Sequence, residues 1–164
     1  MSDFILSCES TADLSAEKLA AIDVKHICFH FMLDGCDYRD DLGQSIPFED
    51  FYRAMANGAD TKTAAVGTGD YLEYFGSFLE QGKDVLYLAF SSGLSGTYQT
   101  ACITAQDLME EYPGRRVVCV DTLQASMGEG LLTFEAALLR KQGKSLDEVA
   151  DYVRTQGQSY CAWF

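Results

Sequence analysis

Positive charge is scarce in this sequence. Only 12 Lys and Arg residues stand against 25 Asp and Glu residues in a chain of 164, and the formal net charge is -13. A protein with this excess of negative charge repels nucleic acid backbones and anionic membrane surfaces. The composition therefore argues against nucleic acid as a partner.

Long hydrophobic runs are also missing. No apolar stretch approaches the roughly 20 residues that a membrane-spanning helix needs. The N-terminal stretch MSDFILSCES lacks the basic region and the long apolar segment of a secretory signal. These absences predict a soluble, cytoplasmic protein. A hydrophobic content of 48% in 164 residues predicts one globular domain with a substantial core.

The cysteines have no C-x-x-C spacing, and most lie inside apolar runs, where a cysteine behaves as a small hydrophobic residue. We therefore predict free, buried thiols rather than a disulfide framework or a metal site. The six are Cys8, Cys28, Cys36, Cys102, Cys119 and Cys161.

The chain alternates between apolar runs typical of strands and amphipathic stretches typical of helices. Strands are predicted over residues 3–9, 24–33, 84–90 and 115–122. Helices are predicted over residues 10–22, 47–57, 69–82, 96–112, 125–143 and 146–156, with a hairpin-like turn around Gly35. The alternation predicts an α/β fold with a mostly parallel sheet and helices on both faces.

Two segments carry further expectations. His26 and His30 are predicted to share one face of the strand 24–33, in a packed or hydrogen-bonded role, with a metal site as the alternative.

The last residues, YCAWF, form an apolar run with no turn or polar tail after it. A domain can end on a docked strand, but this abrupt end favours the first part of a longer polypeptide.

Small hydroxyl residues and glycines are concentrated in AFSSGLSGTYQTA, between the strand 84–90 and the helix 96–112. The first turn of a helix leaves backbone N–H groups without partners and favours an anion. Gly93 and Gly96 would let a ligand approach the backbone, while Ser92, Ser95 and neighbouring hydroxyls would donate hydrogen bonds. Residue types alone leave two interpretations open, an anion site or a helix cap that permits tight packing.

Known catalytic motifs do not fit this stretch. No Lys follows the glycines as in a P-loop, and GLSGT lacks the second glycine of a nucleophile elbow. Asp121 and the hydroxyls of Ser10, Thr11 and Thr63 also fall at or just beyond predicted strand ends. Several polar groups are therefore expected to converge on one crevice.

Four segments resemble the DegV family, whose members include the fatty-acid-binding subunits of bacterial fatty acid kinase. They are ESTADLS near the N-terminus, TKT ending at Thr63, SSGLSGTYQTA, and VVCVDTLQASMGEG. They occur in the family's order and approximate spacing, and the resemblance spans nearly the whole chain. It implies that residues 1–164 are an amino-terminal α/β domain that is followed, in the family, by a second and smaller domain.

The resemblance also implies a ligand and a site. A long-chain fatty acid would lie in an apolar tunnel between the domains, with its carboxylate held by Thr63, Ser95, Ser92 and Gly96. Candidate tunnel walls are HICFHFML and the helix from Pro47. The protein would use no catalytic residue, metal or cofactor, and it would present the acid to a partner fatty acid kinase.

Two departures from the family and two rival functions complete the expectations. Ala64-Ala65-Val66 replaces the usual Ser-Gln-Pro after the threonine, which removes polar side chains behind Thr63, and Glu9 replaces the usual Asp.

One rival function is that of a small hydrolase or phosphotransfer enzyme using Ser95 or Asp121, although no base or Mg²⁺ site is evident beside the serine turn. The other is an interaction module without a ligand.

Overall fold

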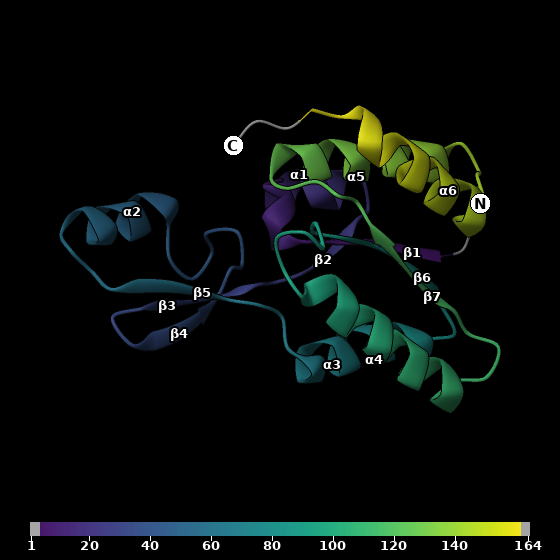
Figure 1. Ribbon diagram of the computed structural model, residues 1–164, viewed down its shortest axis with the longest axis horizontal. Coiled ribbons are helices and arrows are strands. Elements are labelled where there is room, and N and C mark those ends of the chain that lie inside the picture. Colours follow the sequence, from purple (N-terminus) through teal and green to yellow (C-terminus); the bar gives the residue numbers. More distant parts are fainter. Residues whose placement is uncertain (1–3, 162–164) are drawn as a thin grey trace.

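Two β-sheets of different kinds organise the computed structural model, which describes residues 4–161 (Figure 1). A parallel sheet has the strand order β2-β1-β6-β7, and an antiparallel sheet has the order β4-β3-β5. The parallel strands are β1 (Phe4–Glu9), β2 (Lys25–Ile27), β6 (Asp84–Ala89) and β7 (Val117–Asp121); the antiparallel ones are β3 (His30–Leu33), β4 (Cys36–Arg39) and β5 (Thr61–Ala64).

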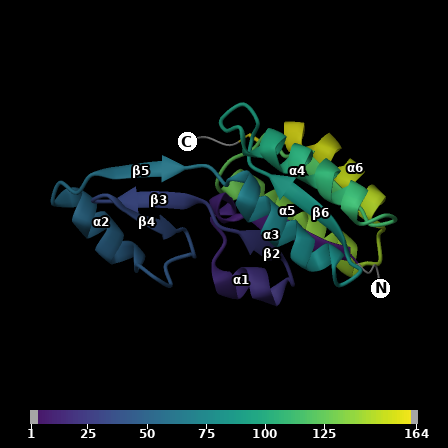
Figure 2. The same cartoon turned by 90° about the horizontal axis from the view of Figure 1, so that it is seen from below.

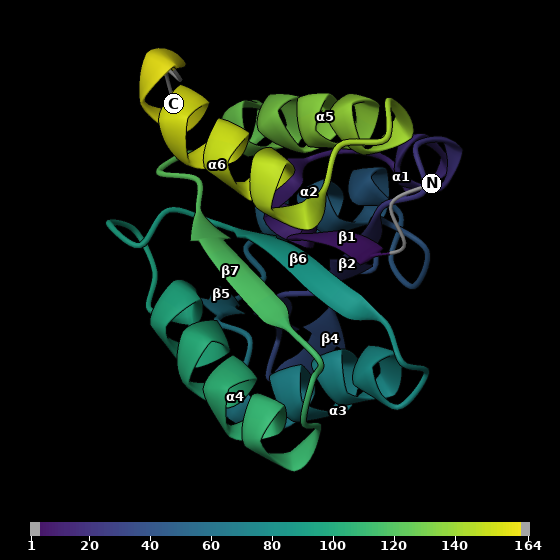
Figure 3. The same ribbon diagram turned by 90° about the vertical axis from the view of Figure 1, so that its right-hand side faces the viewer.

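Helices cover both faces of the parallel sheet, as Figure 3 shows. They are η1 (Ser10–Ala12), α1 (Ala16–Ala21), α3 (Thr68–Leu79), α4 (Thr97–Glu111), α5 (Met127–Lys141), α6 (Leu146–Gln156) and η2 (Gly157–Ser159), while α2 (Phe48–Ala56) lies apart with the antiparallel sheet. Side chains of β6 alternate between the two faces. Leu86 and Leu88 enter the core under α1, α5 and α6, whereas Val85 and Tyr87 enter the core under α3 and α4. The predicted mostly parallel sheet with helices on both faces is confirmed.

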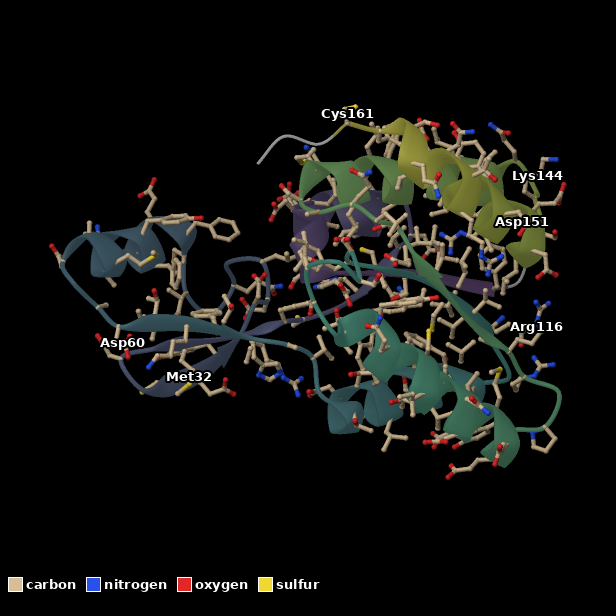
Figure 4. The ribbon with its side chains drawn as sticks, viewed as in Figure 1. Met32, Asp60, Arg116, Lys144, Asp151 and Cys161 are labelled. Atoms are coloured by element: carbon tan, nitrogen blue, oxygen red, sulfur yellow. The ribbon has the colours of Figure 1, made fainter. Side chains whose placement is uncertain are left out.

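The antiparallel sheet and α2 form an arm, residues 30–64, that extends away from the parallel sheet and its helices, here called the body (Figure 2). The predicted hairpin is confirmed: β3 and β4 pair antiparallel, and Asp34 and Gly35 at the turn both have positive φ, as a tight two-residue turn requires. Figure 4 labels Met32 and Asp60 on the arm and Arg116, Lys144 and Asp151 on the body. The strand β5, which was not predicted, completes this sheet.

The single strand predicted over residues 24–33 is wrong. The chain leaves the parallel sheet after β2, where the Phe29 N–H donates to the Ser10 hydroxyl at 3.0 Å, and it enters the antiparallel sheet at β3. His26 and His30 therefore lie in different sheets and share no strand face. The hydrogen-bonded role of His30 is confirmed, since its Nδ1 lies 3.2 Å from an Asp37 carboxylate oxygen.

The helix predicted over residues 10–22 is also wrong in its first half. A single 3-10 turn is followed by Asp13 with φ 53°, and α1 starts only after Ser15, whose hydroxyl accepts from the Lys18 N–H. The other predicted helices of the body agree with the structure to within two or three residues. The capping box of Ser145 and Glu148 at the start of α6 is confirmed.

The remaining expectations concern the C-terminal segment and the thiols. Tyr160 and Cys161 form no strand, and the rest of YCAWF lies outside the described residues. All six cysteines are free as predicted, but only Cys8 is fully buried, and Cys36 and Cys161 are exposed. Within residues 4–161, no helix is both long enough and apolar enough to cross a membrane.

Gly130 allows α5 to pack directly on the turn that follows β1. A Cβ atom at this position would lie 2.4 Å from the Ala12 carbonyl oxygen, a distance that real Cβ contacts do not reach. The glycine is therefore required by a close backbone approach, which explains the final glycine of the ASMGEG segment.

We expect Gly130→Ala to lower the free energy of unfolding by about 1–3 kcal/mol, because the helix must shift to accommodate the new methyl group. Gly69→Ala is a matched control, since a Cβ there meets nothing within 4 Å; it should leave stability unchanged or raise it by up to about 1 kcal/mol. Urea unfolding of both variants measures the difference. Equal stabilities would show that the close approach does not constrain the packing.

Candidate functional site

A cavity of about 690 Å³ lies where the arm meets the body. From the body, the turn after β1 contributes Ser10, Thr11 and Leu14. Phe29, which precedes the arm, also lines the cavity, and from the arm come His30 and Phe31 of β3, the segment 40–46, three aromatic residues of α2, and Thr63 of β5. The cavity thus exists only because the chain turns away from the parallel sheet between β2 and β3.

The arm side of the cavity is mainly aromatic. Phe31 stacks on Tyr38 with ring centroids 5.5 Å apart, and Phe51 of α2 meets Phe31 edge-on at 5.1 Å. The amphipathic helix α2 has no fully buried residue, and Phe48 and Tyr52 remain 57% and 64% exposed. The aromatic side chains of α2 therefore form an apolar wall that is open to the cavity, whereas aromatic side chains in the core of the body are buried. Of the segments predicted as tunnel walls, the middle of HICFHFML (Phe29, His30 and Phe31) and the aromatic residues of α2 line this cavity.

Negative charge surrounds part of the cavity. Asp13, Asp40 and Asp41 contribute to the lining, and neither Lys nor Arg is among the described residues that line it. The Asp41 carboxylate accepts hydrogen bonds from the backbone N–H groups of Gln44 and Ser45 and so holds the loop before α2. An anionic group would be repelled from this side of the cavity, whereas an uncharged apolar chain would not.

Thr63 lies inside β5, opposite Phe31 of β3, with its side chain exposed at the cavity. Thr63 was expected at or just beyond a strand end, and it is the next-to-last residue of β5, an unpredicted strand at the edge of the antiparallel sheet. Its hydroxyl reaches the cavity from the arm, while those of Ser10 and Thr11 reach it from the body.

Ser92, Ser95 and Gly96 lie in the connection between β6 and α4, at the end of the parallel sheet that faces the arm (Figure 1). The Ser95 Oγ accepts from both the backbone N–H and the hydroxyl of Thr97, at 3.3 and 3.2 Å. A hydroxyl has two acceptor positions and one hydrogen. Both acceptor positions of Ser95 are used by Thr97, so the hydroxyl keeps its own hydrogen to donate to a ligand.

The structure thus divides the predicted polar residues into two groups. Thr63, Ser10 and Thr11 line the cavity, whereas Ser92, Ser95 and Gly96 are not among its lining residues. Asp121 belongs to the second group: its Oδ1 accepts from the Ser92 N–H at 3.2 Å and from the Leu123 N–H at 3.0 Å. Asp121 therefore holds the backbone of the β6–α4 connection.

A buried carboxylate behind the β6–α4 connection was missed by the sequence analysis. Glu9, at the end of β1, is fully buried and accepts hydrogen bonds from the Tyr71 and Tyr87 hydroxyls and from the Phe90 N–H. Burial raises the pKa of Glu9, and these hydrogen bonds oppose the rise. The only sequence signal was the glutamate in ESTADLS, which stands where the family usually has aspartate.

A second buried carboxyl group lies beside the first. The Thr11 hydroxyl lies 3.0 Å from Oε2 of Glu129 and 3.4 Å from Oε2 of Glu9. Within the described chain, Oε1 of Glu129 and the Thr133 hydroxyl are buried without hydrogen-bond partners. Complete burial, followed by the negative charge of Glu9, raises the pKa of Glu129 well above its ordinary value. The environment therefore favours a protonated Glu129.

A carboxyl group with a raised folded-state pKa makes folding less favourable as pH rises, because the folded state binds a proton that the unfolded state has released. We expect Glu129→Gln to be more stable than the wild type at pH 8, because the neutral amide places no negative charge in this buried position and has no proton to take up on folding. The difference should shrink as pH falls toward the ordinary value of 4.5. Urea unfolding across pH 4.5–8 measures it. Exposed Glu110→Gln on α4 is the control, and parallel curves for the two variants would contradict the expectation.

Comparison with known proteins agrees with this architecture. The family model described as "Uncharacterised protein, DegV family" matches residues 6–164. A DegV domain-containing protein of Clostridium perfringens is 34% identical over 164 residues, which are 100% of this chain and 56% of that protein.

Two solved structures are similar in fold. A fatty acid (stearic acid)-binding protein from Eubacterium ventriosum superimposes with a TM-score of 0.82 at 26% identity, over 92% of this chain and 52% of the other. A DegV family protein from Thermus thermophilus, described by its fatty acid binding, superimposes with a TM-score of 0.79 at 29% identity, over 95% and 54%. The chain thus spans about half the length of these relatives. By sequence and by fold, it belongs to the DegV family.

Proposed function

We propose that the protein binds a long-chain fatty acid, with the acyl chain in the cavity between arm and body and the carboxylate at Thr63 and the β6–α4 connection. The observation that carries this proposal is the open aromatic wall of the arm, formed by residues that do not pack against the chain's own core. The two related structures described by their fatty acid binding support the ligand class.

The head-group chemistry follows from the available donors. Thr63 and Ser95 offer neutral hydroxyl groups, and Ser92 and Gly96 lie in the same connection as Ser95. A hydrogen bond to a charged group contributes about 1.5–3 kcal/mol. Two or three such bonds can satisfy a carboxylate without a buried cation.

The acyl chain supplies most of the affinity in this proposal. Burial of each CH₂ group contributes about 0.8 kcal/mol, so a long chain gains on the order of 10 kcal/mol before ordering costs are subtracted. A second domain, as in the family, would cover the exposed side of Phe48 and Tyr52 and close the cavity. It would follow residues 1–164, which we assign to the amino-terminal α/β domain.

We assign no catalytic step to this site. The protein would carry the acid in the cytoplasm and present its carboxylate to a partner fatty acid kinase, which supplies the phosphoryl transfer. A hydrolase or phosphotransferase using Ser95 or Asp121 is less consistent with the geometry, because the Ser95 hydroxyl accepts hydrogen bonds from Thr97 and Asp121 holds the backbone at Ser92 and Leu123. An interaction module without a ligand is the second alternative, and the binding assays below distinguish it.

We expect Ser95→Ala and Thr63→Val each to weaken binding of a long-chain acid about tenfold or more, because each removes a hydrogen bond to the carboxylate. Displacement of a fluorescent fatty acid from the purified protein measures the affinity, and organic extraction identifies any acid bound on purification. Thr155→Ala is the control, since this hydroxyl donates to the Asp151 carbonyl on α6. Unchanged affinity in a variant that combines Ser95→Ala and Thr63→Val would contradict the head-group assignment. Absence of fatty acid binding in the wild-type protein would favour the interaction module.

We expect Phe51→Ala to weaken binding more for longer acyl chains, because it removes a ring that faces the cavity from α2. A short-chain acid that reaches only the hydroxyl groups should be affected little. Phe134→Ala on α5 is the control, since Phe134 is 43% exposed and does not line the cavity. Affinities measured for a series of chain lengths test the expectation. A loss that is the same for every chain length would place the acyl chain elsewhere.

A further inference from the structure

The hydroxyl of Thr11 joins the cavity to the two buried carboxyl groups. Thr11 lines the cavity from the body, and its hydroxyl lies 3.0 Å from Oε2 of Glu129 and 3.4 Å from Oε2 of Glu9. The same oxygen of Glu9 accepts from the Phe90 N–H at 2.9 Å. Thr11 therefore links the cavity with the start of the β6–α4 connection, because it contacts the same oxygen atom as Phe90.

The close approach at Gly130 brings the first turn of α5 against the turn that contains Thr11. Glu129, the residue before this glycine, is fully buried, and so is Thr133 one helical turn later. Within residues 4–161, Oε1 of Glu129 and the Thr133 hydroxyl have no hydrogen-bond partner. One of the two carboxyl oxygens of Glu129 is thus enclosed by protein without a donor.

These surroundings favour a neutral Glu129. An ionised carboxylate that leaves water needs hydrogen bonds to both of its oxygen atoms, and Oε1 receives none. The titratable groups that face Glu129 are Glu9 and Cys8 of β1 and Asp13 beside η1, and the ionised form of each is negative. The positive end of the α5 dipole favours an anion here, but to a smaller extent than desolvation disfavours it.

A neutral Glu129 sets the direction of its hydrogen bond with Thr11. A threonine hydroxyl has one hydrogen and two acceptor positions, and a protonated carboxyl group can itself donate. Across the 3.0 Å contact the Glu129 proton can be donated to the Thr11 oxygen, so the Thr11 hydrogen is not needed there. Glu9 competes weakly for that hydrogen, because it lies 3.4 Å away and already accepts from Tyr71, Tyr87 and Phe90. The Thr11 hydrogen is therefore available to a ligand in the cavity.

We propose that Thr11 donates a further hydrogen bond to the bound carboxylate, and that Glu129 is a positioning residue that keeps Thr11 in the donating orientation. This inference rests on the proposed function, because it adds a donor to Thr63 and Ser95 for the same ligand. Loss of the Glu129 proton would turn the Thr11 hydrogen toward the new carboxylate and place a negative charge behind the head group. Fatty acid affinity therefore falls as the pH becomes high enough to ionise Glu129.

The pH dependence of fatty acid affinity tests the positioning role of Glu129. Displacement of a fluorescent fatty acid, measured from about pH 6 to pH 9, should show the wild type losing affinity relative to Glu129→Gln as pH rises, because the amide stays neutral and donates to Thr11 throughout. Comparison of the two proteins at each pH cancels the ionisation of the fatty acid itself. Glu129→Leu, which cannot donate, should bind more weakly than Glu129→Gln at every pH. A constant ratio of wild-type to Glu129→Gln affinity would overturn the positioning role.

Substitution of Thr11 tests the donor itself. Thr11→Val should weaken fatty acid binding about tenfold or more, because a hydrogen bond to a charged group is lost, and Thr11→Ser, which keeps the hydroxyl, should retain the affinity. Thr104→Val is the matched control, since this buried hydroxyl donates to the Thr100 carbonyl within α4 and Thr104 does not line the cavity. Binding that Ser95→Ala weakens but Thr11→Val leaves unchanged would overturn this inference alone. A wild-type protein that binds no fatty acid would overturn the proposed function together with it.

Discussion

The buried carboxylate of Glu9 ties the scaffold together. A carboxylate taken out of water costs several kcal/mol unless hydrogen bonds replace its hydration, so its donors must be brought to it. They come from α3 through Tyr71, from β6 through Tyr87, and from the start of the β6–α4 connection through the Phe90 N–H. The serine-rich connection begins at the next residue. The position of that connection, and of the helix it opens, therefore depends on the end of β1.

The arm adds the apolar part of the site. Its position relative to the body is set where the Phe29 N–H meets the Ser10 hydroxyl, at the point where the chain leaves the parallel sheet. The arm then presents Phe31, Phe51 and Tyr52 to a cavity that is also lined by hydroxyl and carboxylate side chains from both arm and body. An open aromatic wall with a polar end suits a long amphiphilic ligand, because transfer of the apolar chain from water and hydrogen bonding of its head require different surfaces.

Much of the fold could be predicted from the sequence because local patterns carried it. The continuous apolar run of β6 indicated a strand buried on both faces, and helical periodicity indicated α4 and α5. The break between β2 and β3 could not be predicted, since it depends on a hydrogen bond between residues 19 apart in the chain. The strand β5 has no alternating apolar pattern, and it forms because β3 offers a free edge. Thr63 lines the same cavity as the hydroxyl residues Ser10 and Thr11, but it belongs to the antiparallel sheet, whereas they follow a strand of the parallel sheet.

The sequence by itself determined the kinds of elements, their order, and the motif segments that mark the family, because these depend on residues close together in the chain. Only the tertiary structure decided which groups lose contact with water and which come together. The burial of Glu129 beside Glu9 and the junction of arm and body are both contacts between distant residues. Their energies depend on desolvation and packing, which local sequence patterns do not encode.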